Sequence, residues 1–488
     1  MGPWNATSSE ESMPTGSNRV RSFGLLTLGF LAIEAIGSLM ACRGKSVKNA
    51  GVVAAVGSGT GAPSPVVVTS SPGPAEATKA HDKCAPAPSS SLVVNVRKAA
   101  YGAKGDGVTD DTDAIQRAVN AVAGTGGTVM VPDGTYMVNA VAQNAAGIRL
   151  GSKMTMKLSS GAVLKAIPNA SGNYAILAVS FASHVTIVGG TLLGERGSHT
   201  GTDGEWGMGL SINNSAHVVV QDVTAKECWG DGFYVTSLSS DVTLCGVVAD
   251  HNRRQGLSVT SVEGLVVRNS TFKNSVGTAP ECGIDLEPND SQIINNAQVT
   301  GCTITNNVGG GISCGFNSAF GGPTAITNIT ITNNAISGNG AGTRAPGAAE
   351  FPSGVYVANA KGGTALGNGV VVSSNTISGN YGSGIAVFSG TTHASVIGNT
   401  VTGTLLVSGN TAWTGNGIEV DGSPNTNVTN NTVTGNATNG IWLMRSDPTV
   451  VISGNTVTGN AGIGVIQAGS KTSMKNSVNN VYGNGKTP

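Results

Sequence analysis

The chain is poor in charged and in aromatic residues. Of its 488 residues only 11% are charged and 4% are aromatic, and 27 Lys and Arg balance 27 Asp and Glu. So low a charged fraction excludes a charge-rich disordered protein and a long coiled coil. Proteins that bind nucleic acids usually carry an excess of basic residues, and this chain has a net charge of zero. We therefore expect no nucleic-acid partner.

Cysteine is scarce, and its spacing excludes a common metal site. The seven cysteines show neither a C-x-x-C motif nor a Cys/His spacing typical of zinc. Most fall in the body of the chain: Cys228, Cys245, Cys282, Cys302 and Cys314. We expect buried free thiols there, with a disulfide between neighbouring repeats as the alternative.

Glycine is abundant without the period of a fibrous protein. The chain holds 72 Gly but no Gly-X-Y repeat, which excludes collagen. The glycine content therefore indicates an ordered fold in which many positions require glycine.

The first 42 residues have the pattern of an export signal. Arg19 and Arg21 precede an apolar run over 23–40, which ends in Leu-Met-Ala-Cys at Cys42. This ending resembles the lipobox of bacterial lipoproteins, in which the cysteine carries the lipid. We therefore predict lipidation of Cys42 and attachment to a bacterial membrane in the cell envelope. An ordinary cleaved signal of a secreted protein and a single membrane anchor are the alternatives.

Residues 43–91 are rich in Ala, Ser, Pro, Gly and Val, and Cys84 lies among them. Such a composition cannot bury a core, so we predict a disordered tether. The ordered domain is predicted over residues 92–488.

A short helix is predicted near the start of this domain. Asp110 or Asp111 is placed to cap its N-terminus. Apolar residues then recur at i, i+3, i+4 and i+7, namely Ile115, Ala118, Val119 and Val122. One amphipathic helix before a row of strands would cover the exposed edge of a solenoid.

The sequence around this helix is similar to a known family. The stretches 101–112 (YGAKGDGVTDDT) and 126–136 (GGTVMVPDGTY) closely resemble the opening of pectate-lyase-superfamily proteins. That family contains right-handed parallel β-helices that act as lyases, glycoside hydrolases and mannuronan C5-epimerases. The resemblance implies this fold and a carbohydrate substrate, but it does not choose the reaction.

The rest of the domain is a repeat. The pattern Gly, apolar, any, apolar recurs with steps of mostly 22 to 33 residues. It begins at Gly209, Gly232, Gly256, Gly283, Gly311, Gly354, Gly384, Gly417, Gly440 and Gly462. A second pattern, Asn-Thr-Ile/Val-Ser/Thr-Gly, begins at Asn375, Asn399, Asn431 and Asn455. Short alternating strands at such a step predict one coil per repeat and about a dozen coils rising about 4.8 Å each.

These observations predict an all-β protein, a single right-handed parallel β-helix with a short N-terminal capping helix. Stacked Asn side chains are expected to hydrogen-bond along the stack. The longer steps between Gly311 and Gly354 and between Gly384 and Gly417 mark insertions, which either wall a binding site or vary freely.

One column of side chains carries the predicted site. The residue two after each glycine should point to solvent, and successive coils should stack these positions. The column reads Ser211, Tyr234, Ser258, Asp285, Ser313, Tyr356, Ala386, Glu419 and Trp442. Aromatic members offer flat surfaces for sugar rings.

Acidic and basic residues crowd around the column, and we predict a polysaccharide-binding groove there. The predicted catalytic residues are Asp285, Glu287, Asp231, Arg254 and Arg253. The predicted substrate-binding residues are Tyr234, Gln255, Glu281, Tyr356, Glu419 and Trp442.

Two reactions fit these residues. Asp285 and Glu287, with Asp231 two coils away, have a spacing that suits an inverting glycosidase, and hydrolysis of this kind requires no cofactor. Elimination on a uronate polymer, or epimerisation, would instead use Arg253 or Arg254, with Ca²⁺ held by the acidic residues. A non-catalytic glycan-binding or adhesin-like surface protein is the competing class. We favour hydrolysis slightly.

Further polar residues lie near this region. Asp203 and Glu205 precede the column by one coil and would complete a subsite or a Ca²⁺ site. His251 is either a base or, more commonly for a single histidine, structural. Asp106 and the Asp110-Asp111 pair are predicted to serve in turns and in the helix cap.

Overall fold

The computed structural model describes the domain with a few gaps. The described residues are 84, 86, 88–289, 291–316, 325–341, 352–359, 367–388, 391–407, 414–445, 449–467 and 479–486. The predicted signal with Cys42 and most of both predicted insertions lie outside them. Within the described residues, no helix is long and apolar enough to cross a membrane.

Three parallel sheets form the domain, and each coil between the two ends of the stack contributes a strand to each sheet. The first sheet runs β1 (Val93–Asn95), β3 (Thr128–Val131), β6 (Met154–Leu158), β9 (Ser183–Val188), β12 (Ala216–Gln221), β15 (Ser239–Cys245), β18 (Val262–Arg268), β21 (Ile293–Thr300), β24 (Ala325–Thr332), β27 (Gly367–Ser373), β31 (Ser395–Ile397), β34 (Asn427–Thr429) and β37 (Val451–Ser453), with β30 (Thr391–Thr392) beside β27.

The second sheet runs β2 (Asp106–Asp110), β4 (Gly134–Val138), β7 (Ala162–Ala166), β10 (Thr191–Leu193), β13 (Thr224–Lys226), β16 (Val248–Asp250), β19 (Thr271–Lys273), β22 (Thr303–Thr305), β25 (Ala335–Ser337), β28 (Thr376–Ser378), β32 (Thr400–Thr402), β35 (Thr432–Thr434), β38 (Thr456–Thr458) and β40 (Asn480–Tyr482).

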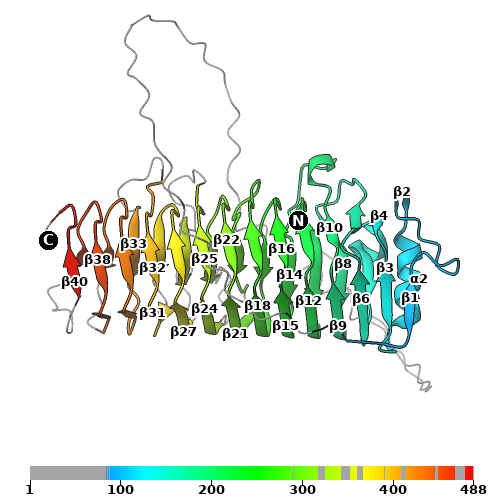
Figure 1. The fold of residues 1–488 in the computed structure, drawn as a ribbon, viewed down its shortest axis with the longest axis horizontal. Helices are drawn as coiled ribbons and strands as arrows, with labels where there is room; N and C mark the ends of the chain where they lie inside the picture. The colour runs from blue at the N-terminus through cyan, green and yellow to red at the C-terminus, as the bar shows by residue number, and fades with distance from the viewer. Residues whose placement is uncertain are drawn as a thin grey trace, which may run out of the picture. The chain divides into compact units, whose positions relative to one another are not determined.

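The third sheet runs β5 (Ala146–Leu150), β8 (Asn173–Ser180), β11 (Trp206–Asn213), β14 (Phe233–Thr236), β17 (Leu257–Val259), β20 (Ile284–Leu286), β23 (Ile312–Phe316), β26 (Ser353–Asn359), β29 (Ser383–Val387), β33 (Asn416–Asp421), β36 (Ile441–Met444) and β39 (Val465–Gln467). Figure 1 shows these strands following one another along a single stack, which confirms the predicted parallel β-helix.

The core consists of aliphatic columns inside the stack. In the second sheet the middle residue of each short strand points inward, and its neighbours face outward. Ile336, Ile377, Val401, Val433 and Val457 occupy successive positions of one such column and are almost fully buried. This alternation explains why Thr-Val-Thr is the commonest strand sequence in the C-terminal coils.

One glycine on each of successive coils lies at the turn that leads into the strand of the third sheet, and these glycines stack in a column. A Cβ atom added to Gly256 would lie 2.5 Å from the carbonyl oxygen of Gly283 on the next coil, and Gly354 meets the oxygen of Gly384 at 2.6 Å. No larger residue fits there without a shift of backbone. The last member is Gly464, whose oxygen faces Gly440. The predicted member Gly462 is therefore wrong by two residues.

Asparagine side chains form ladders inside the turns, as predicted. The Nδ2 group of each donates to the Oδ1 of the next at 2.9 to 3.0 Å along Asn334, Asn375, Asn399, Asn431, Asn455 and Asn479. A second ladder joins Asn307, Asn339 and Asn380, and after Thr404 it resumes through Asn436, Asn460 and Asn484.

Replacing Asn399 with Ala is expected to destabilise the domain by about 3 kcal/mol, because four hydrogen bonds are lost inside the protein. Asn399 donates to Val372 O and Asn431 Oδ1, and it accepts both the backbone and the side-chain N–H of Asn375. Urea unfolding measures the change. Thr400→Ala, at the exposed neighbouring position, is the control, and equal stability of the two variants would contradict the ladder's contribution.

Helix α2 (Thr112–Val122) lies beside β1 at the N-terminal end of the stack (Figure 1). Its buried face contains the predicted stripe, Ile115, Ala118, Val119 and Val122, together with Thr112 and Ala114. Asp110 accepts the N–H of Thr112, whereas the carboxylate of Asp111 accepts the N–H groups of Lys104 and Gly105 in the preceding loop. Elsewhere in the described residues, two short helical turns are α3 (Ala142–Ala145) and η1 (Arg196–Ser198).

One disulfide joins Cys84 to Cys245 at the end of β15. The prediction of buried free thiols holds for Cys228, Cys282, Cys302 and Cys314, but it is wrong for Cys245. Cys84 lies within the segment predicted as a disordered tether, so at this residue the chain is fixed to the β-helix.

Candidate functional site

The predicted column of side chains exists on the outer face of the third sheet. The strand register places Ser258, Asp285, Ser313 and Tyr356 on successive coils, and it continues through Ala386 and Glu419 to Trp442. The predicted exposure is wrong for most of the column. Asp285 and Ser258 are 0% exposed and Glu419 is 3% exposed, because the outward side chains of neighbouring coils cover one another.

Arg254 is the centre of the polar site. Its Nη1 group donates to Asp231 Oδ2 at 3.2 Å, and its Nη2 group donates to Glu287 Oε1 at 3.0 Å. Its Nε atom lies 3.9 Å from Glu205 Oε2. We call Glu205, Asp231, Asp285 and Glu287 the carboxylate cluster. Three coils contribute these acids and Arg254 comes from a fourth, so the stacking of coils brings together residues that lie far apart in the sequence.

Two neutral side chains connect the cluster. Gln255 Nε2 donates to Asp285 Oδ2 at 2.9 Å and lies 3.4 Å from Glu287 Oε1. Ser258 Oγ donates to the same Glu287 oxygen at 3.3 Å. All donors to Glu287 therefore act on Oε1, and in the described structure Oε2 is its oxygen without a hydrogen-bond partner.

Burial separates the acids of the cluster. Asp231 and Asp285 are completely buried, whereas the side chains of Glu205 and Glu287 are 14% and 23% exposed. Burial raises the pKa of Asp231 to about 7, against the lowering effect of Arg254. Burial also raises the pKa of Glu205. Burial alone would lower the pKa of Arg254, but Asp231, Glu287 and Glu205 outweigh it and hold that pKa well above its ordinary value.

Arg253 and Glu281 do not join the carboxylate cluster, contrary to the predicted crowding. The Arg253 guanidinium lies over the Trp229 ring, 3.8 Å from its centroid, and donates to the carbonyl oxygens of Gly204 and Trp229. Glu281 accepts the N–H of Gly277 in its own loop. Both residues therefore shape the corner between the second and third sheets.

His251 is also outside the cluster. It is half exposed, and its Nδ1 atom lies 2.7 Å from Asp250 Oδ1. It therefore does not contribute to the carboxylate cluster, and its role as a structural residue or as a base stays a prediction.

The predicted aromatic residues are spread along the column. Tyr234 packs against a small cluster that includes Met208, and its hydroxyl lies 3.5 Å from Thr260 Oγ1. Tyr356 meets Phe388 edge to face. Both are partly covered, so neither presents a fully open platform.

Glu419 forms a separate buried acid farther along the sheet. It accepts the Ser383 hydroxyl at 2.6 Å, and burial raises its pKa to about 7. Trp442 follows it on the next coil. Four coil steps separate Glu419 from Asp285, or about 19 Å, so Glu419 and Trp442 cannot serve the same reacting bond as the carboxylate cluster.

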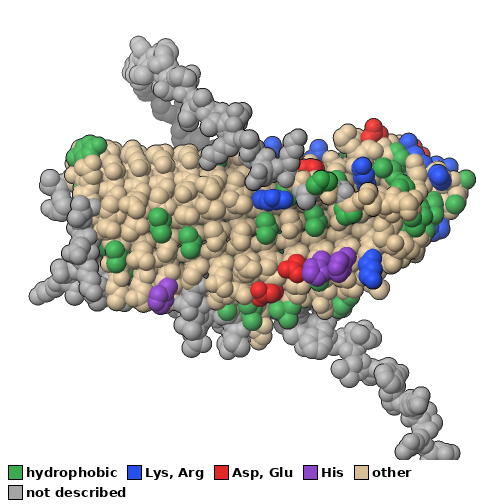
Figure 2. Space-filling model, turned by 60° about the horizontal axis from the view of Figure 1, so that its bottom comes forward, with side chains coloured by type: hydrophobic (Ala, Val, Ile, Leu, Met, Phe, Trp, Pro, Cys, Tyr) green, Lys and Arg blue, Asp and Glu red, His purple; other side chains and the backbone are tan. Residues whose placement is uncertain are grey.

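Charged side chains are unevenly distributed over the surface. On the face in Figure 2, acidic and basic side chains of the described residues lie mainly over the coils nearer to the α2 end, and the other end is mainly uncharged. The carboxylate cluster thus lies in the more highly charged half of the described solenoid.

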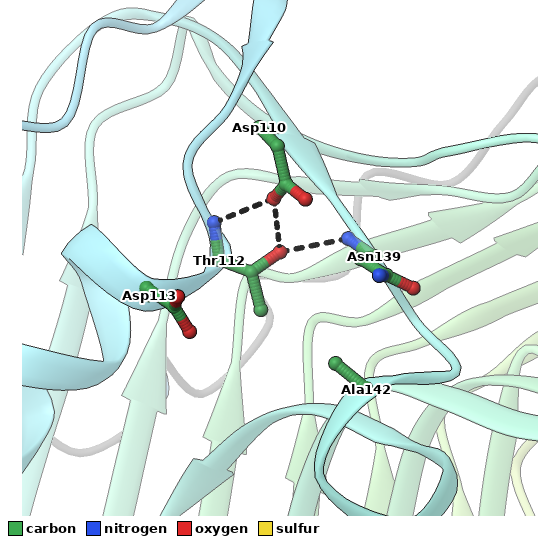
Figure 3. A pocket seen from close by; sticks show the side chains of 5 residues that line it. All are labelled: Asp110, Thr112, Asp113, Asn139 and Ala142. Atoms are coloured by element: carbon green, nitrogen blue, oxygen red, sulfur yellow. Dashed lines mark hydrogen bonds between the residues drawn. The ribbon is translucent and has the colours of Figure 1, made fainter.

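A hollow of about 380 Å³ lies beside α2, lined by Asp110, Thr112, Asp113, Asn139 and Ala142. Figure 3 shows that Asp110 accepts the N–H and the hydroxyl of Thr112, and that this hydroxyl accepts the N–H of Asn139. Asp106 likewise accepts two N–H groups of its own turn. These acids serve in the turn and the helix start, as predicted.

The described residues contain no group of three or more His, Cys, Asp and Glu side chains arranged to hold a metal ion. In the carboxylate cluster the guanidinium of Arg254 already contacts three of the four acids. The cluster therefore does not fit the Ca²⁺ that elimination or epimerisation was expected to use.

Comparison with known families identifies the fold. Residues 93–312 match the model described as "Rhamnogalacturonase A/epimerase, pectate lyase-like". Residues 93–312 are thus similar to pectate-lyase-like proteins, and the described part of the chain has the fold of a right-handed parallel β-helix. Among solved structures, the chain resembles the mannuronan C-5 epimerase AlgE6 A-module of Azotobacter vinelandii, with a TM-score of 0.54 at 22% identity over 81% of this chain and 97% of that one. It also resembles PfbA, a surface adhesin of Streptococcus pneumoniae, with a TM-score of 0.56 at 18% identity over 80% and 97%.

Curated relatives match only parts of this pectate-lyase-like β-helix. The uncharacterised protein YclG of Bacillus subtilis is 28% identical over 214 residues, which are 38% of this chain and 37% of that protein. The chain thus spans about a third of the length of the relatives matched first.

Residues 317–485 match a second model, described as "Periplasmic copper-binding protein (NosD)". Among the described residues of this stretch, the soft copper ligands are His393 and Met444, which lie on different coils. Copper favours thiolate, thioether and imidazole ligands gathered at one point. The residues described in this stretch do not fit a copper site.

Proposed function

We propose that this protein is an enzyme that cleaves glycosidic bonds of a polysaccharide at the carboxylate cluster. The observation that carries the proposal is the convergence of Glu205, Asp231 and Glu287 on Arg254 in a chain with few charges. A surface that only binds glycans would let these acids splay apart. Instead the fold holds them together and partly desolvates them, as acid–base chemistry requires.

Glu205 and Glu287 are the proposed catalytic acids, because they are the exposed members of the cluster. Both contact one guanidinium, Glu205 Oε2 at Nε and Glu287 Oε1 at Nη2, so the two carboxylates lie beside one another at one site, as a paired acid and base require. Glu205, whose pKa burial raises, protonates the leaving glycosidic oxygen. Glu287 Oε2 accepts a proton from the water that attacks the anomeric carbon.

Asp231 and Asp285 position this pair. Asp231 is fully buried beneath Arg254 and fixes the guanidinium through Nη1. Asp285 is fully buried and holds Gln255, which in turn reaches Glu287. This proposal replaces the predicted working pair, Asp285 and Glu287, by Glu205 and Glu287.

β-Elimination on a uronate polymer is the second candidate, and one observation favours it. Arg253 has no carboxylate within ion-pair distance in the described structure, and burial lowers its pKa. Arg253 can therefore bind the carboxylate of a uronate, or lose its own proton and act as a base, more readily than Arg254. Arg254 is already ion-paired with three acids. The likeness to an adhesin concerns the fold alone.

Incubation with a panel of neutral and uronate polysaccharides tests the proposal. We expect new reducing ends without an absorbance of unsaturated sugars, since hydrolysis leaves no double bond. Unsaturated products would establish the elimination instead. Binding without any cleavage would leave a glycan-binding protein.

We also propose export to the cell envelope with a lipid at Cys42. The Cys84–Cys245 disulfide supports export, because disulfides persist mainly in oxidising compartments. Cys42→Ala is expected to move the protein from the membrane fraction to the soluble fraction. Cys84→Ser is the control that removes a cysteine without the lipid site. Unchanged membrane association of Cys42→Ala would refute the lipid anchor.

A further inference from the structure

Four side chains outside the carboxylate cluster form a second polar group at the corner between the second and third sheets. We call Tyr174, Glu195, His199 and Trp229 the corner cluster. The side chains of Glu195 and His199 are 0% and 1% exposed. The His199 ring stacks on Trp229 with 3.8 Å between centroids, and Arg253 covers the same indole at 3.8 Å. Trp229 is thus available through its edge, not through an open face.

The hydrogen bonds of the corner cluster fix the roles of its atoms. Glu195 Oε1 accepts the Tyr174 hydroxyl, and it lies 2.8 Å from His199 Nδ1 and 3.4 Å from Asn169 Nδ2. Burial and the nearby carboxylate raise the pKa of Tyr174, so this phenol keeps its proton and donates. Nδ1 faces a carboxylate oxygen and therefore carries a proton, which leaves Nε2 as the free nitrogen of the ring.

Three buried polar atoms of this cluster have no hydrogen-bond partner: His199 Nε2, Glu195 Oε2 and Trp229 Nε1. Buried polar groups in folded proteins are paired in more than about 90% of cases. Three such atoms on contacting side chains therefore point to a ligand group that completes them.

The mixture of donors and acceptors defines that ligand. Trp229 Nε1 donates only, Glu195 Oε2 accepts, and His199 Nε2 does either according to its proton. A sulfate or carboxylate would be repelled by Glu195, and a metal ion would find one histidine and one carboxylate. A saccharide hydroxyl both donates and accepts, so one hydroxyl matches Trp229 Nε1 and His199 Nε2, and a second hydroxyl of the same sugar unit matches Glu195 Oε2.

A short glycine-containing segment covers this position. A Cβ atom on Gly201 would lie 2.8 Å from His199 Nε2, so only glycine passes so close. The segment 200–204, which we call the strap, is held by Thr200 N–H to Asn169 O and by Arg253 Nη1 to Gly204 O. The next residue is Glu205 of the carboxylate cluster, so the strap connects the two clusters.

We propose that the corner cluster is a subsite for one hydroxyl-bearing saccharide unit, which displaces the strap and hydrogen-bonds to His199 Nε2 and Trp229 Nε1. This inference rests on the proposed polysaccharide substrate and adds a position at the corner of the coils that carry Glu205 and Asp231. Through the strap, a sugar bound there would also set the position of Glu205.

Binding of xylan, mannan, galacturonan and mannuronan hexasaccharides to the full chain tests the subsite, followed by tryptophan fluorescence and by calorimetry. We expect at least one hexasaccharide to bind and to change the emission of Trp229. Trp229→Phe keeps an aromatic ring in the stack but removes the N–H, and it should abolish the emission change. Trp229→Phe and His199→Gln should each weaken binding about tenfold, the effect of one hydrogen bond. His251→Gln, on a neighbouring coil at the same corner, should bind as the unchanged protein does.

The outcomes separate the subsite from the proposed reaction. Saccharide binding that depends on His199 and Trp229, without cleavage, would support the subsite and overturn the enzymatic function. Cleavage with affinities and emission unchanged in both variants would overturn the subsite, and water alone would then complete the three atoms. If none of the four hexasaccharides binds, the proposal that the corner cluster is a saccharide subsite is overturned. Circular dichroism checks that each variant keeps its sheets.

Discussion

Glu287→Gln is expected to lower turnover of the polysaccharide by at least 10² to 10⁴, the usual contribution of a general acid or base. The substitution keeps the shape of the side chain and its contacts with Gln255 and Ser258, but it removes the charge that activates water. Glu205→Gln should cause a similar loss, because its amide has no proton to give to the leaving oxygen. Initial rates at saturating substrate measure both effects.

Ser313→Ala is the matched control for this experiment. Ser313 lies in the same column on the coil after Asp285, and its buried hydroxyl has no hydrogen-bond partner in the described structure. Its loss should leave turnover unchanged. Asp285→Asn distinguishes the two assignments of the pair: a loss as large as that of Glu287→Gln, together with an active Glu205→Gln, would restore the pair Asp285 and Glu287. Full activity of Glu287→Gln would refute the site.

The free energy of unfolding is expected to fall as the pH rises from about 4 to about 7, because Asp231 has a raised pKa. In this range the folded protein holds a proton on Asp231 that the unfolded chain, with a pKa near 3.8, has released. Stability therefore decreases through this window and levels off above it. A shift of about three pKa units corresponds to on the order of 4 kcal/mol. Urea unfolding at pH 5 and pH 8 measures the larger part of this change, about 2.7 kcal/mol.

Asp231→Asn should reduce this pH dependence, since an amide does not titrate. Glu419→Gln should remove a second, similar contribution, because burial raises the pKa of Glu419 in the same direction. Asp203→Asn changes an exposed acid on the coil before and should leave the slope as it is. An unaltered slope in Asp231→Asn would contradict the buried acid.

The sequence predicts the coils well because the repeat and the packing have the same cause. Each glycine marks the turn where backbone oxygens approach, and each strand needs an inward aliphatic residue, so the pattern indicates the register of Asp285, Ser313 and Tyr356 directly. The error at Gly462 shows the limit of that pattern. The segment Gly462-Ile463-Gly464-Val465 matches the Gly, apolar, any, apolar pattern from Gly462, but the glycine at the turn is Gly464. The ladder resolves the choice, because the turning glycine follows the ladder asparagine by four residues, as in Asn436 to Gly440 and Asn460 to Gly464.

Other features leave no periodic trace. The disulfide joins Cys84 to Cys245 across 161 residues, and nothing in either local sequence specifies the partner. Burial of the column depends on how long side chains such as Arg254 and Gln255 lie across the sheet, which a strand pattern does not encode. Glu195 and His199 were missed because their corner is irregular. The signal that would have found them is a Glu and a His four residues apart, together with Tyr174 on the coil before.

The asparagine ladder makes the C-terminal coils interchangeable. Each rung presents the same donor to the next coil and the same acceptor to the previous one, whichever coil that is. The steps from Asn375 to Asn399 and from Asn431 to Asn455 are both 24 residues. Excising one such unit, or duplicating it, would rejoin the ladder without an unpaired amide. This end of the solenoid can therefore change its length in evolution or by design while the charged coils around Arg254 keep their geometry.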